Sequence, residues 1–222
     1  MGIRRLLGGF SISRKHRLIE NTPYAVGCIM RTPQENAFMA LKSTIFKAEL
    51  QVADLDRAHY ATYPLTLARH PSENDARMML RLLAFALFAD EALEFGKGIS
   101  SDDEPALWQR DLTGAVERWI ELGEPEERTI RRAAGRANEV VVLSYGGKAS
   151  QMWWQKNASA LAVLGNLRVL RVSPAECQAL AALAQRGMQV QATIQEGSVL
   201  MTNGDTVAEV TPEILQAPKG KA

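Results

Sequence analysis

The stretch between residues 140 and 172 limits the possible folds of this chain more than any other. Residues 140–142 form a short, unbroken apolar run of the kind found in buried strands, and a Gly146-Gly147 turn follows. A helix is expected over residues 152–163, and residues 167–172 read as a second strand. A strand, a helix and a strand within about 30 residues indicate a βαβ unit with parallel strands.

Regular patterning begins earlier, near residue 44. Residues 44–52 alternate between apolar and polar side chains, which is typical of a half-buried strand. A polar turn follows at residues 54–57, and a second short run around residues 60–68 is expected to pair back onto the first. The domain therefore starts with a strand pair.

An amphipathic helix is predicted after this pair. Ser72, with Asp75 three residues later, has the spacing of a capping box that would start the helix. Glu73, Arg77 and Arg81 fall at four-residue steps on one side of it. These three are either a ladder of solvated ion pairs or a polar row that borders a site.

Three more strands are expected over residues 92–96, 106–112 and 116–123, where closely spaced glycines favour an antiparallel meander. Pro125 would then begin a helix that runs to about residue 137. The middle of the chain thus reads as α-βββ-α-β, which predicts an α/β fold.

The C-terminal part adds a helix and a hairpin. Ser173 and Glu176 have capping-box spacing and would open a helix that Gly187 ends. Residues 190–210 are predicted to form a hairpin that turns at Asn203-Gly204.

The first 38 residues lack a helical or strand period and contain scattered Gly and Pro. We expect this segment to be a disordered extension or the product of a start codon assigned too far upstream, with a single domain over residues 39–218. No apolar stretch reaches the roughly 18 residues needed to span a bilayer. Two cysteines, Cys28 and Cys177, lack metal-ligand spacing and cannot build a disulfide framework, which favours the reducing cytoplasm.

The charge of the expected domain argues against binding DNA over its whole surface. Residues 39–222 carry 20 basic and 23 acidic side chains. Nucleic acid would need a local basic strip, and the helix after Pro125 offers one in Arg128, Arg132 and Arg136, with Arg131 alongside. The alternative is an ordinary helix surface that complements the helix dipole.

Acidic residues gather around two strands of the predicted meander. Asp102, Asp103 and Glu104 precede one strand, and Glu121 lies near the end of the next. Neighbouring antiparallel strands can bring such positions together, and converging carboxylates suit Mg²⁺ or Mn²⁺. A metal held there could activate water and stabilise charge on a phosphate, whereas the alternative is a solvated acidic turn.

Several segments resemble the YaeQ family of bacterial proteins over about residues 39–218. They are Met39-Ala-Leu-Lys, Ile45-Phe-Lys-Ala-Glu-Leu, Leu65-Thr-Leu-Ala-Arg-His-Pro-Ser-Glu73, Met78-Met, Arg81-Leu-Leu-Ala-Phe-Ala, Ala89-Asp-Glu-Ala-Leu-Glu-Phe95, Asp102-Asp-Glu-Pro-Ala-Leu-Trp108, Trp119-Ile-Glu-Leu-Gly123 and the stretch from Val199 to Pro218. The resemblance implies a variation on the PD-(D/E)XK nuclease fold. That means a mixed sheet with an α-βββ-α-β core, extended by the N-terminal strands and the C-terminal helix and hairpin.

The same resemblance implies roles for particular residues. Glu73 would be the acid of the first helix, Asp103 (or Glu104) the aspartate of the "PD" motif, and Glu121 the acid of "(D/E)XK". A Mg²⁺ or Mn²⁺ ion would be held by Asp103, Glu104 and Glu121. The lysine of the last motif, which orients the attacking water in such nucleases, is replaced here by Gly123. The candidates to supply its charge are Arg131, Arg132 and Lys148.

Three hypotheses follow. The first is a divalent-metal phosphodiesterase acting on DNA or RNA. The second is a non-catalytic module that binds nucleic acid, or a protein of the transcription machinery. The third is a metabolic or structural protein with no nucleic-acid role. Nucleic acid would contact Arg128, Arg131, Arg132, Arg136 and Lys148 in either of the first two.

Overall fold

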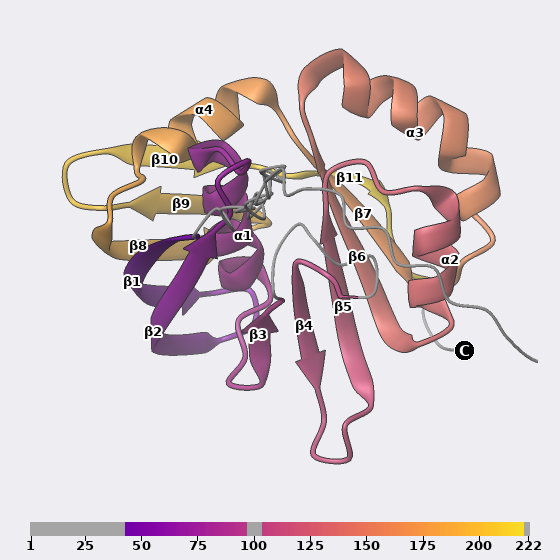
Figure 1. The fold of residues 1–222 in the computed structure, drawn as a ribbon, viewed down its shortest axis with the longest axis horizontal. Helices are drawn as coiled ribbons and strands as arrows, with labels where there is room; N and C mark the ends of the chain where they lie inside the picture. Colours follow the sequence, from indigo (N-terminus) through magenta and orange to yellow (C-terminus); the bar gives the residue numbers. More distant parts are fainter. Residues whose placement is uncertain (1–42, 97–103, 220–222) are drawn as a thin grey trace, which may run out of the picture. The chain divides into compact units, whose positions relative to one another are not determined.

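Two mixed β-sheets and four helices make up the computed structural model over the residues that it describes, 43–96 and 104–219 (Figure 1). Sheet A has the strand order β10-β9-β8-β1-β2, and sheet B has the order β11-β7-β6-β5-β4-β3. All of these residues belong to one structural unit, Ala40–Ala222. The predicted extension, residues 1–38, lies outside the described residues, as do Asp102 and Asp103.

Sheet A begins with the predicted strand pair. β1 (Thr44–Asp54) and β2 (His59–Arg69) are antiparallel, and the apolar positions of β1 are buried while the polar ones between them are exposed. The alternation expected over residues 44–52 is therefore confirmed. β8 (Gly187–Gln195) then lies parallel to β1 on its other side, and β9 (Ser198–Thr202) and β10 (Val207–Val210) follow as antiparallel neighbours.

The prediction of one mixed sheet was wrong, because the strands near the two ends of the chain form a sheet of their own. The predicted hairpin contains three strands, with one turn at Glu196-Gly197 and another at residues 203–206. Helix α4 (Pro174–Ala182) ends before Gly187, which instead opens β8. Pairing β8 with β1 satisfies the backbone along an edge of β1 that a simple hairpin would leave open.

Sheet B contains the predicted meander and the predicted βαβ unit. β3 (Leu93–Phe95), β4 (Leu107–Arg110) and β5 (Val116–Leu122) are antiparallel. From β5 onwards, β6 (Ala137–Tyr145) and β7 (Leu167–Val172) are parallel neighbours.

Two helices connect the parallel strands of sheet B, and one further strand lies at its edge. α2 (Glu127–Ala134) joins β5 to β6, α3 (Gly147–Leu161) joins β6 to β7, and β11 (Glu213–Gln216) pairs with β7 at one edge. The order α-βββ-α-β is thus present from α1 to β6, while its relation to a nuclease fold stays a prediction.

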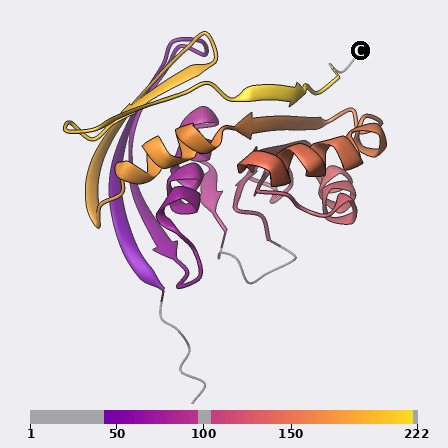
Figure 2. The ribbon, with the colours of Figure 1, turned by 90° about the horizontal axis from the view of Figure 1, so that it is seen from above.

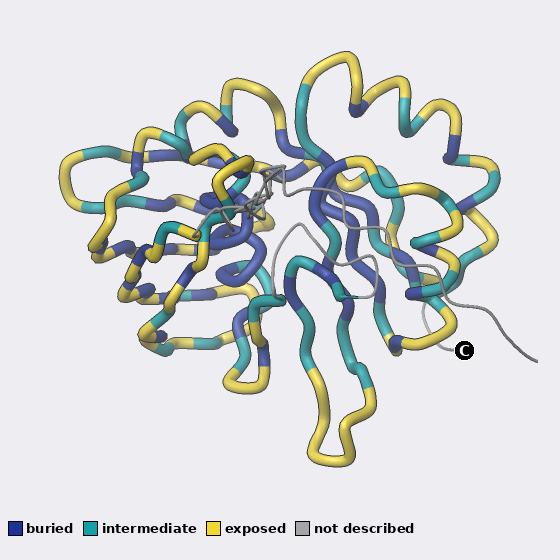
Figure 3. Tube along the Cα trace, viewed as in Figure 1, coloured by how far each residue is buried: buried dark blue, intermediate teal, exposed yellow. Residues whose placement is uncertain are grey.

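Helix α1 (Asp75–Leu87) lies between the two sheets (Figure 2). One apolar cluster joins sheet A, α1 and one face of sheet B, and it includes Leu50, Leu83 and Ile120. The opposite face of sheet B is covered by α2 and α3, where Trp119 and Ile130 belong to a second cluster. The central strands of sheet B are therefore buried on both faces (Figure 3).

The helix ends differ in part from those predicted. Asn74, not Ser72, caps α1, and its Oδ1 accepts a hydrogen bond from the backbone N of Arg77 at 2.8 Å. The Ser72 hydroxyl instead lies 2.5 Å from Nδ1 of His70, so it is not available to the helix. No helix within the described residues is long and apolar enough to cross a membrane.

Candidate functional site

Glu73 precedes α1 and forms ion pairs with two arginines. Its Oε1 lies 2.9 Å from Nη1 of Arg77, and its Oε2 lies 3.1 Å from Nη1 of Arg81. The Arg81 guanidinium also donates to the Ala68 carbonyl at 3.0 Å and lies over the Phe95 ring. Glu73 and Arg81 are buried, so the three charges are a buried network that fastens α1 to neighbouring strands, not a solvated ladder.

Glu121 lies on β5 with its side chain on the face that α2 covers. Nε1 of Trp119, two residues earlier on the same face, donates to Glu121 Oε1 at 2.8 Å. Burial raises the pKa of Glu121, while the bond from Trp119 and the charges of Arg77 and Arg132 act in the opposite direction. Glu121 is half-buried, and a carboxyl with a raised pKa is a common element of functional sites.

Glu73 and Glu121 approach sheet B from opposite faces. Ile120 and Leu122 belong to the cluster around α1, so the residue between them faces the other way. Arg77 connects the two acids electrostatically, because it pairs with Glu73 and its charge also lowers the pKa of Glu121. The sequence placed Arg77 either in a solvated ladder or in a polar row that borders a site, but it did not link Arg77 to Glu121.

Glu104 is the described member of the acidic run that precedes β4. β4 begins three residues later and pairs with β5, with Leu107 opposite Ile120, the neighbour of Glu121. Glu104 itself is half-buried. Asp103 lies outside the described residues. Among residues 43–96 and 104–219, no three His, Cys, Asp or Glu side chains are grouped so that they could hold a metal ion.

Gly123, where the resemblance to nucleases predicted a lysine, has a backbone conformation that favours glycine. Its φ is +97°, in the left-handed region that residues with a side chain rarely adopt, and its N–H donates to the Leu143 carbonyl at 3.0 Å. A Cβ at this position would lie 3.7 Å from Cε1 of Tyr145. A lysine here would therefore strain the backbone as the chain leaves β5.

The three predicted substitutes for that lysine lie in different surroundings. Arg131 pairs with Glu127 at 2.6 Å and donates to the Ala160 carbonyl of α3 at 2.8 Å, so it links two helices. Lys148 is exposed in the first turn of α3. Arg132 is half-buried, and it is the one of the three whose charge lowers the pKa of Glu121.

The predicted basic strip is shorter than expected. α2 ends at Ala134 with Gly135 as its C-cap, so Arg136 lies in the turn into β6 and not on the helix. Arg128 and Arg136 are exposed, whereas Arg132 is half-buried. The helix stops early because Gly135 lacks a side chain that would favour the helical conformation.

Comparison with known proteins places the chain in a family. The family model described as YaeQ protein matches residues 39–212. The chain belongs to the YaeQ family. The relatives include the uncharacterized protein YaeQ of Escherichia coli (strain K12), which is 45% identical over 180 residues that cover 81% of this chain and 99% of the relative. The YaeQ protein of Salmonella typhi, also named uncharacterized, is 44% identical over the same coverage.

Two crystal structures of YaeQ proteins resemble this one. The structure from Xanthomonas axonopodis pv. citri is 51% identical with a TM-score of 0.78, and the match covers 79% of this chain and 99% of the other. The structure from Pseudomonas syringae is 36% identical with a TM-score of 0.76, and the match covers 80% and 98%. The mixed α/β architecture is therefore that of the YaeQ family, whose curated relatives are uncharacterised in function.

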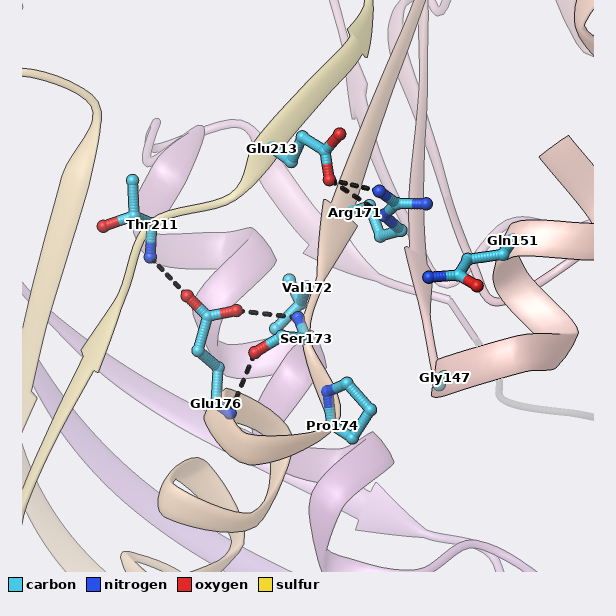
Figure 4. Close-up of a pocket in the computed structure, with 10 residues that line it drawn as sticks. Gly147, Gln151, Arg171, Val172, Ser173, Pro174, Glu176, Thr211 and Glu213 are labelled. Carbon is cyan, nitrogen blue, oxygen red and sulfur yellow. Dashed lines mark hydrogen bonds and ion pairs between the residues drawn. The ribbon is translucent and has the colours of Figure 1, made fainter.

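The YaeQ chain also has a cavity that sequence reasoning did not predict, at the ends of β6 and β7 (Figure 4). Its volume is about 310 Å³, and Gly147, Arg171 and Glu176 are among its lining residues. The Arg171 guanidinium faces Glu213, with Nε 3.0 Å from Oε2. A glycine turn followed by a helix start is a signal that could have located this cavity.

The predicted Ser173–Glu176 capping box is confirmed at the rim of this cavity. Ser173 Oγ accepts from the Glu176 backbone N at 3.3 Å, and Glu176 Oε2 accepts from the Ser173 N at 2.7 Å. The second oxygen of Glu176 accepts from the backbone N of Thr211 at 2.8 Å. Both carboxylates of the cavity are thus engaged in local structure.

Proposed function

We propose that this YaeQ chain is a nucleic-acid-binding module whose nuclease-like order of elements does not hydrolyse phosphodiesters. The observation that supports this most directly is the pairing of Glu73 with Arg77 and Arg81. A carboxylate with both oxygens held by guanidinium groups has little negative charge left to offer a metal ion. Gly123 in place of the motif lysine points the same way, since its backbone conformation does not favour a side chain.

The surface that would meet nucleic acid is formed by exposed cations on α2, α3 and the turn after α2. Arg128, Arg136 and Lys148 are exposed there, and the bond from Arg131 to the Ala160 carbonyl holds the two helices together. Lys148 stands in the first turn of α3, where a cation is mildly unfavourable on its own. A bound phosphate would relieve this, because helix N-termini attract anions.

The test measures binding of fluorescein-labelled 20-nucleotide RNA, single-stranded DNA and duplex DNA by fluorescence anisotropy. The variant Arg128→Glu/Arg136→Glu should bind about tenfold or more weakly. The slope of log affinity against log salt should also become shallower by about 0.9 for each lost phosphate contact on duplex DNA. Lys47→Glu/Arg186→Glu, which reverses two exposed cations of the region around sheet A, is the matched control. Equal losses in both variants, or no salt-dependent binding by the unmodified chain, would refute the proposal.

A metal-dependent phosphodiesterase is the second candidate, and it is favoured by the pairing of β4, the strand that follows Glu104, with β5 next to Glu121. Asp103, Glu104 and Glu121 would hold Mg²⁺ or Mn²⁺, since carboxylate oxygens suit these ions. When bound, such an ion supplies an activated water and stabilises charge on the phosphate. Arg132 would place a positive charge beside Glu121 and help keep that carboxylate ionised.

Calorimetric titration with Mn²⁺ separates the two candidates. Phosphodiesterase chemistry requires saturable heat in the unmodified chain that Glu121→Gln abolishes and Glu117→Gln, on the same strand, retains. It also requires cleavage of labelled DNA or RNA that follows the same pattern. Binding of nucleic acid without Mn²⁺ heat and without cleavage supports the module.

A further inference from the structure

A second cavity lies beyond the C-terminal end of α1, between the turns of sheet A and the face of sheet B that α1 leaves uncovered. Its volume is about 450 Å³, which is within the range of small-molecule sites. Phe88, Leu170, Ile194 and Ile214 contribute apolar surface to its walls. It is separate from the basic surface of α2 and α3, which covers the opposite face of sheet B.

Two arginines share one carboxylate on this face. Nε of Arg118 lies 2.9 Å from one oxygen of Glu139, and Nε of Arg168 lies 3.0 Å from the other. Arg118, Glu139 and Arg168 come from the adjacent strands β5, β6 and β7, and Arg118 lies opposite Glu139 in the register of β5 and β6. Burial would raise the pKa of Glu139, but the bonds and charges of the two arginines lower it, so the carboxylate stays ionised. The trio carries one net positive charge.

The guanidinium groups still have donors to offer. Nη1 of Arg118 donates to Gln109, and its guanidinium lies over the Phe88 ring at 5.0 Å. Within the described part of the chain, Arg168 bonds Glu139 through Nε, and its Nη groups form no hydrogen bond. Arg118 and Arg168 are 24% and 33% exposed, so their free N–H groups are partly desolvated and would bind an anion more strongly than on an open surface.

The other charges of the cavity are engaged elsewhere or lie at its rim. Asp54 is buried and pairs with Arg57 at 2.6 Å. Asp56 accepts from the backbone N–H groups of Glu196 and Gly197 at 2.8 and 2.9 Å. The Glu196 side chain is exposed at the opening of the cavity. These carboxylates belong to the sheet A side, away from the arginine pair.

We propose that this cavity binds a small amphipathic anion, with a carboxylate or phosphate head on Arg118 and Arg168 and an apolar body against Phe88, Leu170 and Ile194. Planar guanidinium groups match such heads because two parallel N–H donors can meet two oxygens. The apolar walls give the body a place out of water, which adds affinity in proportion to the area buried.

Isothermal titration calorimetry on the full chain tests the proposal with four probes. Octanoate and octyl phosphate carry both parts of the expected ligand, 1-octanol lacks the charge, and acetate lacks the apolar body. At least one of the two amphipathic anions should bind saturably at one per chain, at least tenfold more tightly than 1-octanol and acetate. The better of the two identifies the head group. No saturable heat from either, or an equal affinity for 1-octanol or acetate, overturns the proposal.

A variant locates the site. Arg168→Met keeps an apolar stem and leaves the Arg118–Glu139 pair in place, and it should weaken anion binding about tenfold or more. Arg186→Met removes an exposed guanidinium outside the cavity and should bind like the unmodified chain. If Arg168→Met does not fold, as judged by circular dichroism, Ile214→Glu replaces it, since Ile214 is 62% exposed on an edge strand. If the folded variant binds the anion with unchanged affinity, this cavity is not the binding site.

Discussion

Arg81 and Glu73 form an ion pair at 3.1 Å in which the two side chains are only 3% and 1% exposed. Few carboxylates in a protein are so completely withdrawn from water, because a buried charge is tolerated only with a partner. The pair stands where α1 meets the end of β2, through the bond from Arg81 to the Ala68 carbonyl. Its first role is therefore structural.

Glu73→Gln should lower the free energy of unfolding by about 3–5 kcal/mol, because it leaves the charge of Arg81 buried without its counterion. Urea denaturation followed by circular dichroism gives the value. Glu127→Gln, which removes the exposed pair with Arg131, should cost less than about 1 kcal/mol. A loss of under about 1 kcal/mol in Glu73→Gln would show that the pair does not hold α1 in place.

Glu121→Gln should stabilise the protein at neutral pH. The folded-state pKa of Glu121 is raised by burial, so its ionisation favours the unfolded chain as the pH rises above the unfolded value. Glutamine keeps an oxygen for the Trp119 bond and removes this cost. The gain should shrink towards about pH 4, where the carboxyl is protonated in both states. Urea titrations from pH 4 to 8 measure it, and the exposed Glu49→Gln is the control. A gain that does not depend on pH contradicts the assignment.

Gly123→Ala should cost about 1–2 kcal/mol, since its φ of +97° puts a Cβ close to the following carbonyl. Gly147→Ala is the matched control, because that glycine begins α3 without a positive φ and its Cβ would make an ordinary contact with Pro174 at 3.6 Å. Thermal unfolding compares the two. If both variants melt with the unmodified chain, Gly123 is not required by the backbone, and the absence of lysine needs another reason.

Cys177 should react slowly with thiol reagents in the native protein. It is buried, and burial, with the charge of Glu176 adding to it, raises its pKa to about 11. At pH 8 about one thiol in a thousand would be ionised, against about one in four for an exposed cysteine. In the variant Cys28→Ser, labelling by a chromogenic disulfide should be slow in buffer and fast in urea. Rapid labelling in buffer would mean that α4 opens readily.

The sequence predicted those elements whose formation depends on residues close together in the chain. The strand β1 was readable because one of its faces packs on the α1 cluster and the other meets water. The cap at Ser173 was readable because Glu176 stands at the position that returns the bond. The cap at Ser72 was wrong because His70, two residues earlier, takes the hydroxyl and Asn74 is left to accept from Arg77.

The sequence identified which residues of the candidate site interact locally, but not how the fold buries them and brings distant residues together. The spacing of Glu73 and Arg77 marks a pair on a helix, yet its burial depends on packing against β2 and β3, which no local pattern encodes. The cavity beside Arg118, Glu139 and Arg168 was missed for the same reason, since the three residues meet only through strand register. Their side chains are far apart in sequence and carry no motif.

The parallel pairing of β1 with β8 has a consequence for biosynthesis. Asp56, just after β1, and Glu196, just after β8, are joined by a hydrogen bond although 140 residues separate them. At about 5–20 residues per second, roughly 6 to 24 seconds pass between the synthesis of Arg69, the last residue of β2, and that of Gly187, the first residue of β8. During that time one edge of β1 has no partner, and an unpaired edge invites association with other chains. Chaperone demand should therefore concentrate in this interval.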